Sequence, residues 1–295
     1  MRIYHLNCVS TCPLGGRWMD GKSASIWTRG QLSLHCLLIQ TASTLVLVDT
    51  GLGLRDVVDP RSRLSAMFLA MVSPDFREEM TAYRQVQRLG FDPREVRHIV
   101  LTHLDFDHAG GLDDFPNARV HLLGREKDHA LARRTWLDRQ RFRPQQWSSQ
   151  DRWQVYEAGA GEPWFGFDAV RDLAGLPPEI LLVPLYGHTL GHAGVAIRRG
   201  DGWLLQAGDA FFYHAEMDVE RPYCTPGLRF YQWMMEKDRK ARLNNQARLR
   251  ALGTHPQVQI LCAHDSTYFE ALAGRSLQSP APAVSAYRNV SPEFR

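Results

Sequence analysis

The fold of this 295-residue chain is decided by residues 102–111, which read Thr102-His103-Leu104-Asp105-Phe106-Asp107-His108-Ala109-Gly110-Gly111. Two histidines and two aspartates fall within six consecutive positions. The apolar run just before them, residues 96–101, predicts a buried strand. Gly110 and Gly111 allow the backbone to turn tightly afterwards. Four side chains of the metal-ligand type are therefore expected on a loop at the carboxyl end of a strand.

The residue types in this loop favour a metal site. Imidazole nitrogens and carboxylate oxygens are ligands that divalent transition metals accept. Taken singly, a histidine or aspartate is more often a surface or capping residue. Without a cation, however, the neighbouring carboxylates would repel each other and one would tend to hold a proton. A bound metal ion removes that conflict.

Four further stretches carry residues of the same kind, in this order: Val48-Asp49-Thr50-Gly51, Gly187-His188-Thr189-Leu190-Gly191-His192, Gly208-Asp209-Ala210 and Ala263-His264-Asp265. Together with His103-x-Asp105-x-Asp107-His108, they resemble the metal motifs of the metallo-β-lactamase-fold hydrolases. The His-Asp pair at 264 and 265 is similar to that of the N-acyl homoserine lactonase branch. The resemblance extends over residues 44–265, most of the chain.

The resemblance implies two metal sites that share one ligand. The first would use His103, Asp105 and His188, the second would use Asp107, His108 and His264, and Asp209 would bridge the two ions. Asp49 would orient the metal loop through hydrogen bonds rather than bind metal. His192 would support its own loop.

Asp105 is the one departure from the family pattern, which usually has a second histidine at this position. A carboxylate in place of a neutral imidazole adds negative charge to the first site. That charge favours harder metals such as iron or manganese, relative to an all-histidine site. We expect two divalent ions as cofactors, with zinc first and iron or manganese as alternatives.

The implied fold is α/β: an αββα sandwich of two mixed sheets packed back to back, with helices outside. The motifs are spread over more than half of the chain, so dividing it into independent domains would split the site. We predict one metallo-β-lactamase-like domain over residues 1–275, with insertions at about 54–75 and 124–170. Residues 276–295, which hold Ser, Pro and Ala, are predicted as a C-terminal tail.

Hydrophobic periodicity predicts the main elements. Strands are expected at 2–7, 34–39, 44–48, 96–101, 119–123, 180–185, 194–197, 203–206 and 258–262, and helices at 76–89 and 230–252. In the second helix, Trp233 and Leu243 are among the predicted packing positions.

The two predicted insertions have unusual compositions. Residues 63–72 are more apolar than a solvated loop, and we expect them to pack over the site or against a second subunit, which permits a homodimer. Residues 124–154 alternate arginine with tryptophan and phenylalanine. This pattern fits a flap with its aromatic side chains turned inward, a lid over an acidic or acyl-bearing substrate, or a nucleic-acid surface. We regard a nucleic-acid partner as the weakest of these interpretations.

Composition adds few constraints. The formal net charge of +3 does not by itself indicate a nucleic-acid protein. No stretch approaches the roughly 18 apolar residues of a membrane helix, and residues 1–7 lack the apolar core of a signal peptide. We therefore expect no membrane partner and a cytoplasmic location. The five cysteines have no disulfide-like spacing and are predicted to be reduced, although Cys8 and Cys12 could also form half of a zinc site.

These observations favour a dinuclear metal-dependent hydrolase acting on a small molecule, a lactone or carboxylic ester such as an acyl-homoserine lactone. A hydroxide between two ions would be the nucleophile, and Asp107 or Asp209 would take and return a proton. Tyr213, shortly after Asp209, is predicted to donate a hydrogen bond to the substrate. The alternatives are a phosphodiesterase, an iron-dependent thiol or persulfide oxygenase of the same fold, and a metal-binding sensor without turnover.

Overall fold

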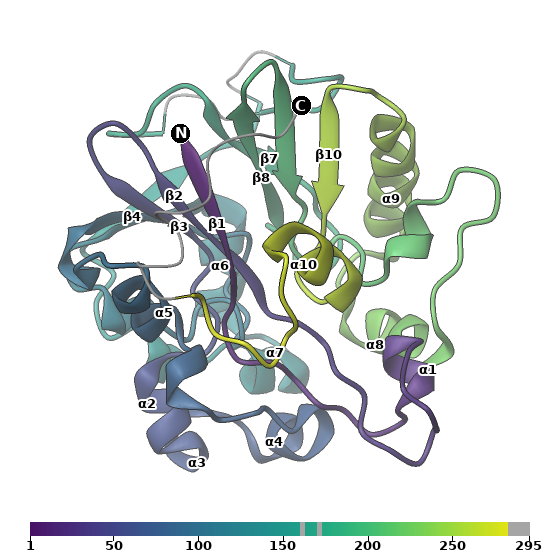
Figure 1. The fold of residues 1–295 in the computed structure, drawn as a ribbon. Helices are drawn as coiled ribbons and strands as arrows, with labels where there is room; N and C mark the ends of the chain where they lie inside the picture. The colour runs from purple at the N-terminus through teal and green to yellow at the C-terminus, as the bar shows by residue number, and fades with distance from the viewer. Residues whose placement is uncertain (160–162, 170–172, 283–295) are drawn as a thin grey trace.

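The computed structural model describes residues 1–159, 163–169 and 173–282, whose strands form two sheets (Figure 1). The six-stranded sheet has the order β1-β2-β3-β4-β5-β6, and the four-stranded sheet has the order β10-β9-β8-β7. The strands are β1 (Arg2–Asn7), β2 (His35–Gln40), β3 (Leu45–Val48), β4 (Val96–Val100), β5 (Arg119–Leu123), β6 (Trp153–Tyr156), β7 (Ile180–Pro184), β8 (Ala193–Arg199), β9 (Gly202–Gln206) and β10 (Val258–Leu261).

Both sheets are mixed. In the first, β1, β2 and β3 pair antiparallel, whereas β3, β4, β5 and β6 pair parallel. In the second, β7, β8 and β9 pair antiparallel, and β10 joins β9 in parallel. Each predicted strand lies within two residues of an observed one. Among the strands of the described residues, only β6 was not predicted, because it is a short edge strand inside the segment expected to be an insertion.

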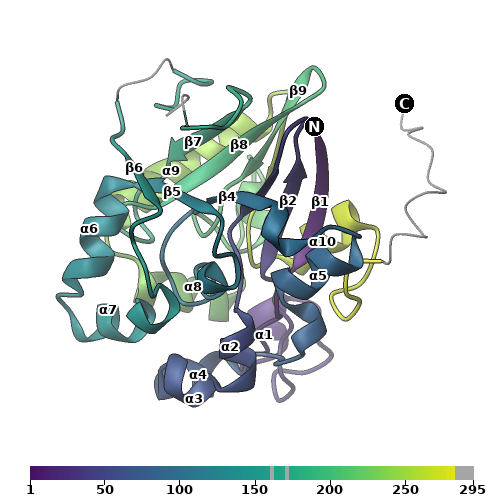
Figure 2. The same cartoon turned by 90° about the vertical axis from the view of Figure 1, so that its left-hand side faces the viewer.

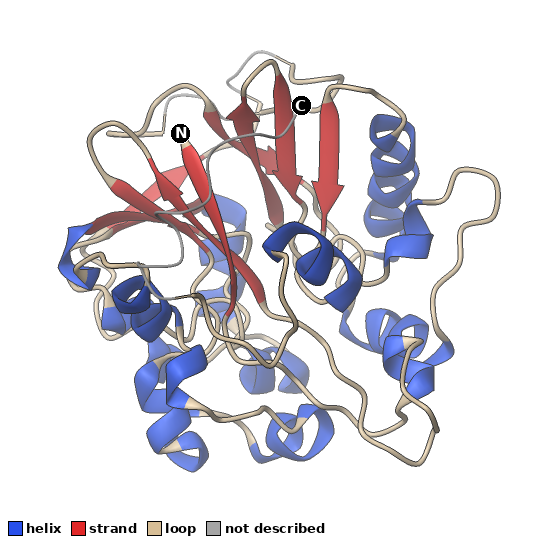
Figure 3. Ribbon diagram, in the orientation of Figure 1, coloured by secondary structure: helices blue, strands red, loops and turns tan. Residues whose placement is uncertain are grey.

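Helices cover the outer faces of the two sheets (Figure 3). They are α1 (Arg17–Asp20), α2 (Leu54–Val58), α3 (Pro60–Arg63), α4 (Ala66–Val72), α5 (Ala82–Arg88), α6 (Gly124–Ala132), α7 (Trp136–Arg141), α8 (Pro226–Met235), α9 (Arg239–Gly253) and α10 (Ser266–Ala273). Short 3-10 helices are η1 (Glu78–Met80), η2 (Pro93–Glu95), η3 (Leu112–Asp114), η4 (Pro144–Gln146) and η5 (His214–Met217). The predicted αββα sandwich is confirmed.

The alternating direction of the side chains along each strand explains how helices and sheets stack in layers, because successive side chains of a strand point to opposite faces. In β2, Leu37 and Ile39 belong to the apolar cluster between the sheets, and Leu38 belongs to the cluster that includes Val86 of α5. Similarly, the outer face of the second sheet packs against Leu249 of α9. These positions are fully buried, so the sheets hold the loops at their ends in fixed positions.

The predicted helix over 230–252 is wrong in one respect: it is two helices, α8 and α9, separated at residues 236–238. The side chain of Asp238 caps α9 by accepting from the backbone of Ala241 at 2.9 Å. Because residues 237 and 238 lie outside both helices, the backbone N–H groups of Lys237 and Asp238 donate to the carbonyl of Gly187, at 2.7 and 3.0 Å. The break therefore holds the loop that carries His188.

Two of the predicted packing positions in this region are also wrong. Trp233 is 56% exposed and Leu243 is 45% exposed. The apolar face of α8 instead includes the buried Leu228 and Met235. Because the helix is interrupted at 236–238, the side chains of α8 and α9 do not follow one continuous helical periodicity. A prediction that treats 230–252 as one helix therefore assigns Trp233 and Leu243 to the wrong face.

The two predicted insertions lie on the side of the molecule near the metal loop. Residues 54–72 form α2, α3 and α4, and Phe68 of α4 packs on Phe106 with ring centroids 4.5 Å apart. Figure 2 shows α6, from the second predicted insertion, beside β5 and β6, with α7 of the same segment below α6. Much of this segment is internal: Phe142, Trp147 and Trp153 are buried.

The predicted tail falls partly within the described residues. Residues 276–282 lie against the body, where Leu277 accepts a hydrogen bond from Asn7 at 2.9 Å and Ala281 is buried. The remaining predicted tail residues, 283–295, lie outside the described residues. Across the described ranges, no helix has the length and apolar character needed to cross a membrane.

Gly51 tests how closely the turn after β3 packs against Cys8, the residue that follows β1. It has a φ of 66°, and a Cβ there would lie 2.2 Å from the Cβ of Cys8. We expect Gly51→Ala to lower the free energy of unfolding by at least about 2 kcal/mol in a urea titration. Gly253→Ala is the control, since its Cβ would have 3.7 Å of clearance. Equal urea midpoints for both variants would contradict this account of Gly51.

Candidate metal centre

The seven predicted ligand residues converge at one edge of the sandwich. His103, Asp105, Asp107 and His108 lie on the loop after β4, His188 lies between β7 and β8, Asp209 follows β9, and His264 follows β10. All seven are at most 7% exposed. Because ionised carboxylates are rarely buried without compensation, positive charge is required at this point.

The side chains form three overlapping groups that could hold a metal ion: His103 with Asp105 and His188, His103 with His108 and Asp209, and Asp107 with His108 and His264. In each group the ligand atoms lie within 4.8 Å of one another. We call His103, Asp105, His188 and Asp209 the first cluster. We call Asp107, His108, His264 and Asp209 the second cluster, so Asp209 belongs to both.

Hydrogen bonds behind the ligands aim them inward. The Nδ1 atom of His264 lies 2.9 Å from the carbonyl oxygen of Ser33, so Nδ1 carries the proton and Nε2 offers its lone pair to the centre. His108 Nδ1 lies 2.9 Å from Asp49 Oδ2. This is the arrangement that orients histidine ligands in metal sites.

Asp49 has the position that the resemblance implied. Its carboxylate accepts from the backbone N–H and the hydroxyl of Thr102, both at 2.8 Å, in addition to its contact with His108. Its φ of 55° lies in the left-handed region, which aspartate adopts more readily than most residues. The turn after β3 therefore fixes both ends of the metal loop.

His192 holds the backbone of Asp209 through a hydrogen bond. Its Nδ1 donates to the carbonyl of Leu185 at 3.0 Å, and its Nε2 accepts from the backbone N–H of Asp209 at 2.9 Å. His192 thus has both ring nitrogens engaged with the backbone.

The second cluster fits a metal ion. His108 Nε2 and Asp209 Oδ1 are buried and have no hydrogen-bond donor among the described residues. Asp209 Oδ1 lies 3.3 Å from His108 Nε2 and 3.2 Å from His264 Nε2, and Asp107 Oδ2 lies 3.7 Å from His264 Nε2. Two imidazoles and two carboxylates around one point form a donor set that divalent transition metals accept.

The two carboxylates of the second cluster have opposite pKa shifts. Burial raises the pKa of Asp107, and His108 and His264 offset this only in part. Burial also raises that of Asp209, but His264 and His108 outweigh it and hold the pKa well below its ordinary value. The side chains around Asp107 therefore do not fully compensate the cost of burying its negative charge, whereas those around Asp209 do.

The first cluster contains a residue that the sequence analysis did not single out. Arg141, at the end of α7, is fully buried. Its Nε donates to Asp105 Oδ1 at 2.6 Å, its Nη2 donates to Asp105 Oδ2, and Nη2 lies 2.8 Å from His188 Nε2. A sequence signal existed: Asp105 adds a buried negative charge, and residues 124–154 supply seven arginines from which a partner could come.

Glu126 of α6 was also missed. Its carboxylate accepts from the backbone N–H of Leu104 at 2.9 Å and from the hydroxyl of Thr189. Burial raises its pKa to about 7, although the hydrogen bond from Thr189 lowers it. Glu126 therefore joins the metal loop to the loop of His188, and no motif in the sequence marks it.

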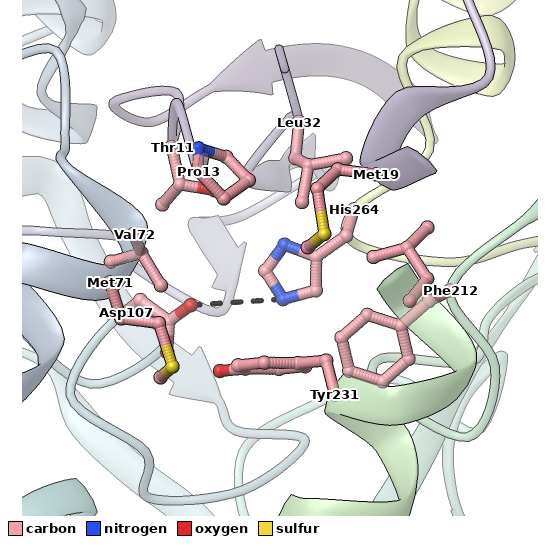
Figure 4. A pocket seen from close by; sticks show the side chains of 11 residues that line it. Thr11, Pro13, Met19, Leu32, Met71, Val72, Asp107, Phe212, Tyr231 and His264 are labelled. Atoms are coloured by element: carbon pink, nitrogen blue, oxygen red, sulfur yellow. Dashed lines mark ion pairs between the residues drawn. The ribbon is translucent and has the colours of Figure 1, made fainter. Parts of the chain in front are cut away.

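An apolar pocket opens onto the second cluster (Figure 4). It is lined by Thr11, Pro13, Met19, Leu32, Met71, Val72, Asp107, Phe212, Leu228, Tyr231 and His264. Met71 and Val72 come from α4, so the apolar segment predicted as an insertion forms part of the pocket wall.

The predicted Tyr213 does not line this pocket. Its ring contacts His214 and Tyr223. Phe212 lines it instead and stacks on His264 with ring centroids 5.0 Å apart.

A different tyrosine, Tyr231 of α8, lies in the pocket. In Figure 4 its hydroxyl points to the side where Asp107 lies. Burial and the nearby Asp107 raise its pKa well above 10, so the hydroxyl keeps its proton. No hydrogen bond of this hydroxyl is found within the described part of the chain, and no sequence motif distinguishes it.

Comparison with known proteins agrees with this geometry. Residues 29–252 match the model of the metallo-beta-lactamase superfamily. A probable metallo-hydrolase of Mycobacterium tuberculosis is 36% identical over 275 residues, which cover 92% of this chain and 82% of the relative. An N-acyl homoserine lactonase of Bacillus thuringiensis is 30% identical over 217 residues, which cover 72% of this chain and 78% of the lactonase.

Solved structures have the same fold. An N-acyl homoserine lactone hydrolase, with the product N-hexanoyl-L-homoserine bound at its catalytic metal centre, superposes with a TM-score of 0.67. The two chains are 21% identical, and the match covers 91% of this chain and 95% of the other. A dizinc quorum-quenching lactonase superposes with a TM-score of 0.59 at 16% identity, covering 89% of this chain and 86% of the other.

The matched residues, the two mixed sheets and the buried histidine–aspartate centre define a metal-dependent hydrolase fold. The chain belongs to the metallo-beta-lactamase superfamily. The prediction of an enzyme of the metallo-hydrolase class is confirmed at this level.

Asp49 provides a test of how the loop orients its ligands. Asp49→Asn keeps the size of the side chain but removes the negative charge that holds His108 Nδ1. We expect zinc affinity to fall by about 10- to 100-fold, as for other groups that orient metal ligands. Competition with a chromophoric chelator measures it. Asp151→Asn, an exposed carboxylate, is the control, and an Asp49→Asn protein that binds zinc as tightly as this control would contradict the role.

Proposed function

We propose that this chain is a metal-dependent hydrolase that opens a lactone or cleaves a carboxylic ester bearing an acyl chain. The observation that carries the proposal is the position of the second cluster, with Asp107 and His264 at the wall of an apolar pocket. A hydrolase for such a substrate needs an apolar surface for the acyl group next to the group that activates the carbonyl.

The pocket lining supports an acyl substrate. Apart from the two ligand residues, most of its wall is aliphatic or aromatic, and the described residues bring no lysine or arginine into it. A phosphodiester or a nucleic acid would require positive charge near its phosphates. The arginines of 124–154 do not supply it, because Arg141 is engaged with Asp105 and the others lie outside the pocket lining.

Asp107, His108, His264 and Asp209 are proposed to hold a divalent ion, zinc by preference. When bound, such an ion supplies Lewis acidity that polarises a carbonyl oxygen and makes water more acidic. The His103, Asp105 and His188 side chains are the remaining predicted ligands, and the prediction of two ions depends on them.

The chain's own groups are proposed to guide the proton and the acyl group. The oxygen of water adds to the carbonyl carbon, the C–O bond of the ester breaks, and the leaving oxygen takes a proton. A carboxylate of Asp107 or Asp209 accepts the proton from water and returns it to the leaving oxygen. Phe212 and Leu228 hold the acyl chain against the pocket wall.

Tyr231 is proposed to donate a hydrogen bond to the substrate oxygen. Its hydroxyl is protonated, lies in the pocket and is not engaged by another described residue. Donors aimed at an oxygen that gains negative charge during acyl transfer lower the barrier. Tyr213, the tyrosine predicted from the sequence, has no comparable access and stays a prediction.

The names of the relatives support the choice of substrate. The relative from Bacillus thuringiensis is an N-acyl homoserine lactonase, and one of the solved structures of the same fold carries a ring-opened acyl product. An N-acyl homoserine lactone is therefore the first substrate to test.

Ring opening of a lactone produces a carboxylic acid, which releases a proton at neutral pH. We expect metal-loaded protein to acidify a weakly buffered panel of lactones with short and long acyl chains, as followed by a pH indicator. The activity should disappear in Asp107→Ala. It should also disappear on chelation and return on adding zinc.

The panel also discriminates the alternatives. No acidification by a protein that retains its metal would reject the lactonase proposal. The same preparation would then be assayed with phosphodiesters and, by oxygen uptake, with thiols and persulfides. Acidification that persists in Asp107→Ala would indicate that the assay detects a contaminant.

Two matched variants test the tyrosines. We expect Tyr231→Phe to lower kcat by about 10- to 100-fold, because it removes one hydroxyl from the pocket and keeps the ring. Tyr213→Phe, which removes a hydroxyl outside the pocket, should leave kcat within about twofold of the wild-type value. The reverse result, in steady-state kinetics on the best lactone, would restore the sequence prediction of Tyr213.

A further inference from the structure

The side chain of Arg141 lies inside the first cluster. Its Nη2 is within hydrogen-bond distance of Asp105 Oδ2 and His188 Nε2. These are the atoms that Asp105 and His188 direct toward each other across 3.0 Å. A guanidinium nitrogen thus contacts two of the atoms that a first ion would require as ligands.

The backbone holds Arg141 in this position. Asp105 and Phe142 form an antiparallel bridge, and the N–H of Phe106 donates to the carbonyl of Arg141 at 3.0 Å. The Nη1 group of Arg141 donates to the carbonyl of Met235 at 2.7 Å. The metal loop, the end of α7 and the end of α8 therefore all fix the guanidinium, which is not a surface side chain that swings in.

The chemistry of this arrangement opposes a metal ion. A guanidinium remains protonated in proteins, so it places a permanent positive charge beside Asp105. Its paired, planar geometry engages both carboxylate oxygens of Asp105. A divalent ion bound by Asp105 and His188 would have to displace these hydrogen bonds and would be repelled by the buried charge.

The second cluster has no such partner. Among the described residues, no lysine or arginine nitrogen forms an ion pair or hydrogen bond with Asp107, His108, Asp209 or His264. His108 Nε2 and Asp209 Oδ1 have no hydrogen-bond partner there, and neither does His103 Nε2 of the first cluster. Within the described residues, the first cluster is therefore paired with a permanently charged arginine, whereas the carboxylates of the second cluster face histidines alone.

We propose that the Arg141 guanidinium takes the place of the first metal ion, so that this chain binds a single divalent ion at the second cluster. Asp105 stands where the family usually has a histidine, and the buried Arg141 balances the negative charge that Asp105 adds. This inference concerns the centre of the proposed function and deepens it, but it can be tested without any substrate.

The first measurement is metal content. Purified full-length protein is stripped with chelator, dialysed against micromolar zinc, and analysed by elemental mass spectrometry. We expect one zinc per chain. With Mn²⁺ instead, electron paramagnetic resonance should show an isolated ion without magnetic coupling to a second. Two zinc ions per chain of comparable affinity, or a coupled manganese signal, would overturn the proposal.

Two single variants locate the ion. His264→Ala removes a ligand of the second cluster and should abolish zinc binding. His103→Ala removes a ligand of the first cluster, and the chain should still bind its one zinc. Loss of zinc in His103→Ala but not in His264→Ala would place the ion in the first cluster and reject the proposal.

Removing the guanidinium should create the missing site. Arg141→Gln leaves Asp105 buried without its partner, which can prevent folding. The double variant Asp105→His/Arg141→Gln removes both charges and restores the family's histidine, so it tests the same idea in a neutral background. We expect two zinc ions per chain in this double variant. Arg134→Gln, an exposed arginine of the same segment, should keep one. A folded double variant that still binds one zinc would contradict the role of Arg141.

These results are independent of catalysis. One zinc per chain with no lactone turnover would support the metal assignment and reject the proposed substrate. Two zinc ions per chain with fast lactone turnover would reject the metal assignment and support the proposed substrate.

Discussion

The structure depends on burying three carboxylates, Asp105, Asp107 and Asp209, at one point in the protein. Buried carboxylates cost several kcal/mol each unless opposite charge and hydrogen bonds compensate them. The surrounding residues are organised to provide this compensation. Histidines with fixed ring orientations face the carboxylates, and Arg141 neutralises one of them directly. The charge that remains at Asp107 and Asp209 is the reason for expecting a cation there.

The two sheets make this concentration of charge possible. The strand ends after β4, β9 and β10 meet at one edge, and the apolar cluster between the sheets fixes their spacing. Contacts from outside the sheets then set the side-chain directions. Asp49 holds the start of the metal loop and His108, Glu126 ties the loop to that of His188, and His192 supports Asp209.

The sequence predicted the parts of this architecture that depend on short, local patterns. Strands were recognisable from apolar runs, and the ligand residues from their spacing within motifs. The pairing of Asp105 with Arg141 was not recognisable, because 36 residues separate them and the arginine is one of several in its segment. Tyr231 was missed for the same reason: its place in the pocket results from how α8 packs. The break between α8 and α9 had a local signal, the capping residue Asp238, which the apolar periodicity concealed.

Most of the pocket wall comes from parts of the chain that do not supply metal ligands. Apart from Asp107, His264 and Phe212, the wall is built by residues before β2, by the end of α4 and by α8, whereas the ligands follow the strands. Mutations in the aliphatic residues of this part of the wall can therefore accumulate without disturbing the buried charges. Over evolutionary time, such a separation lets a lineage exchange one acyl compound for another while the reaction itself is conserved, and it makes the wall the natural target for directed evolution of new specificities.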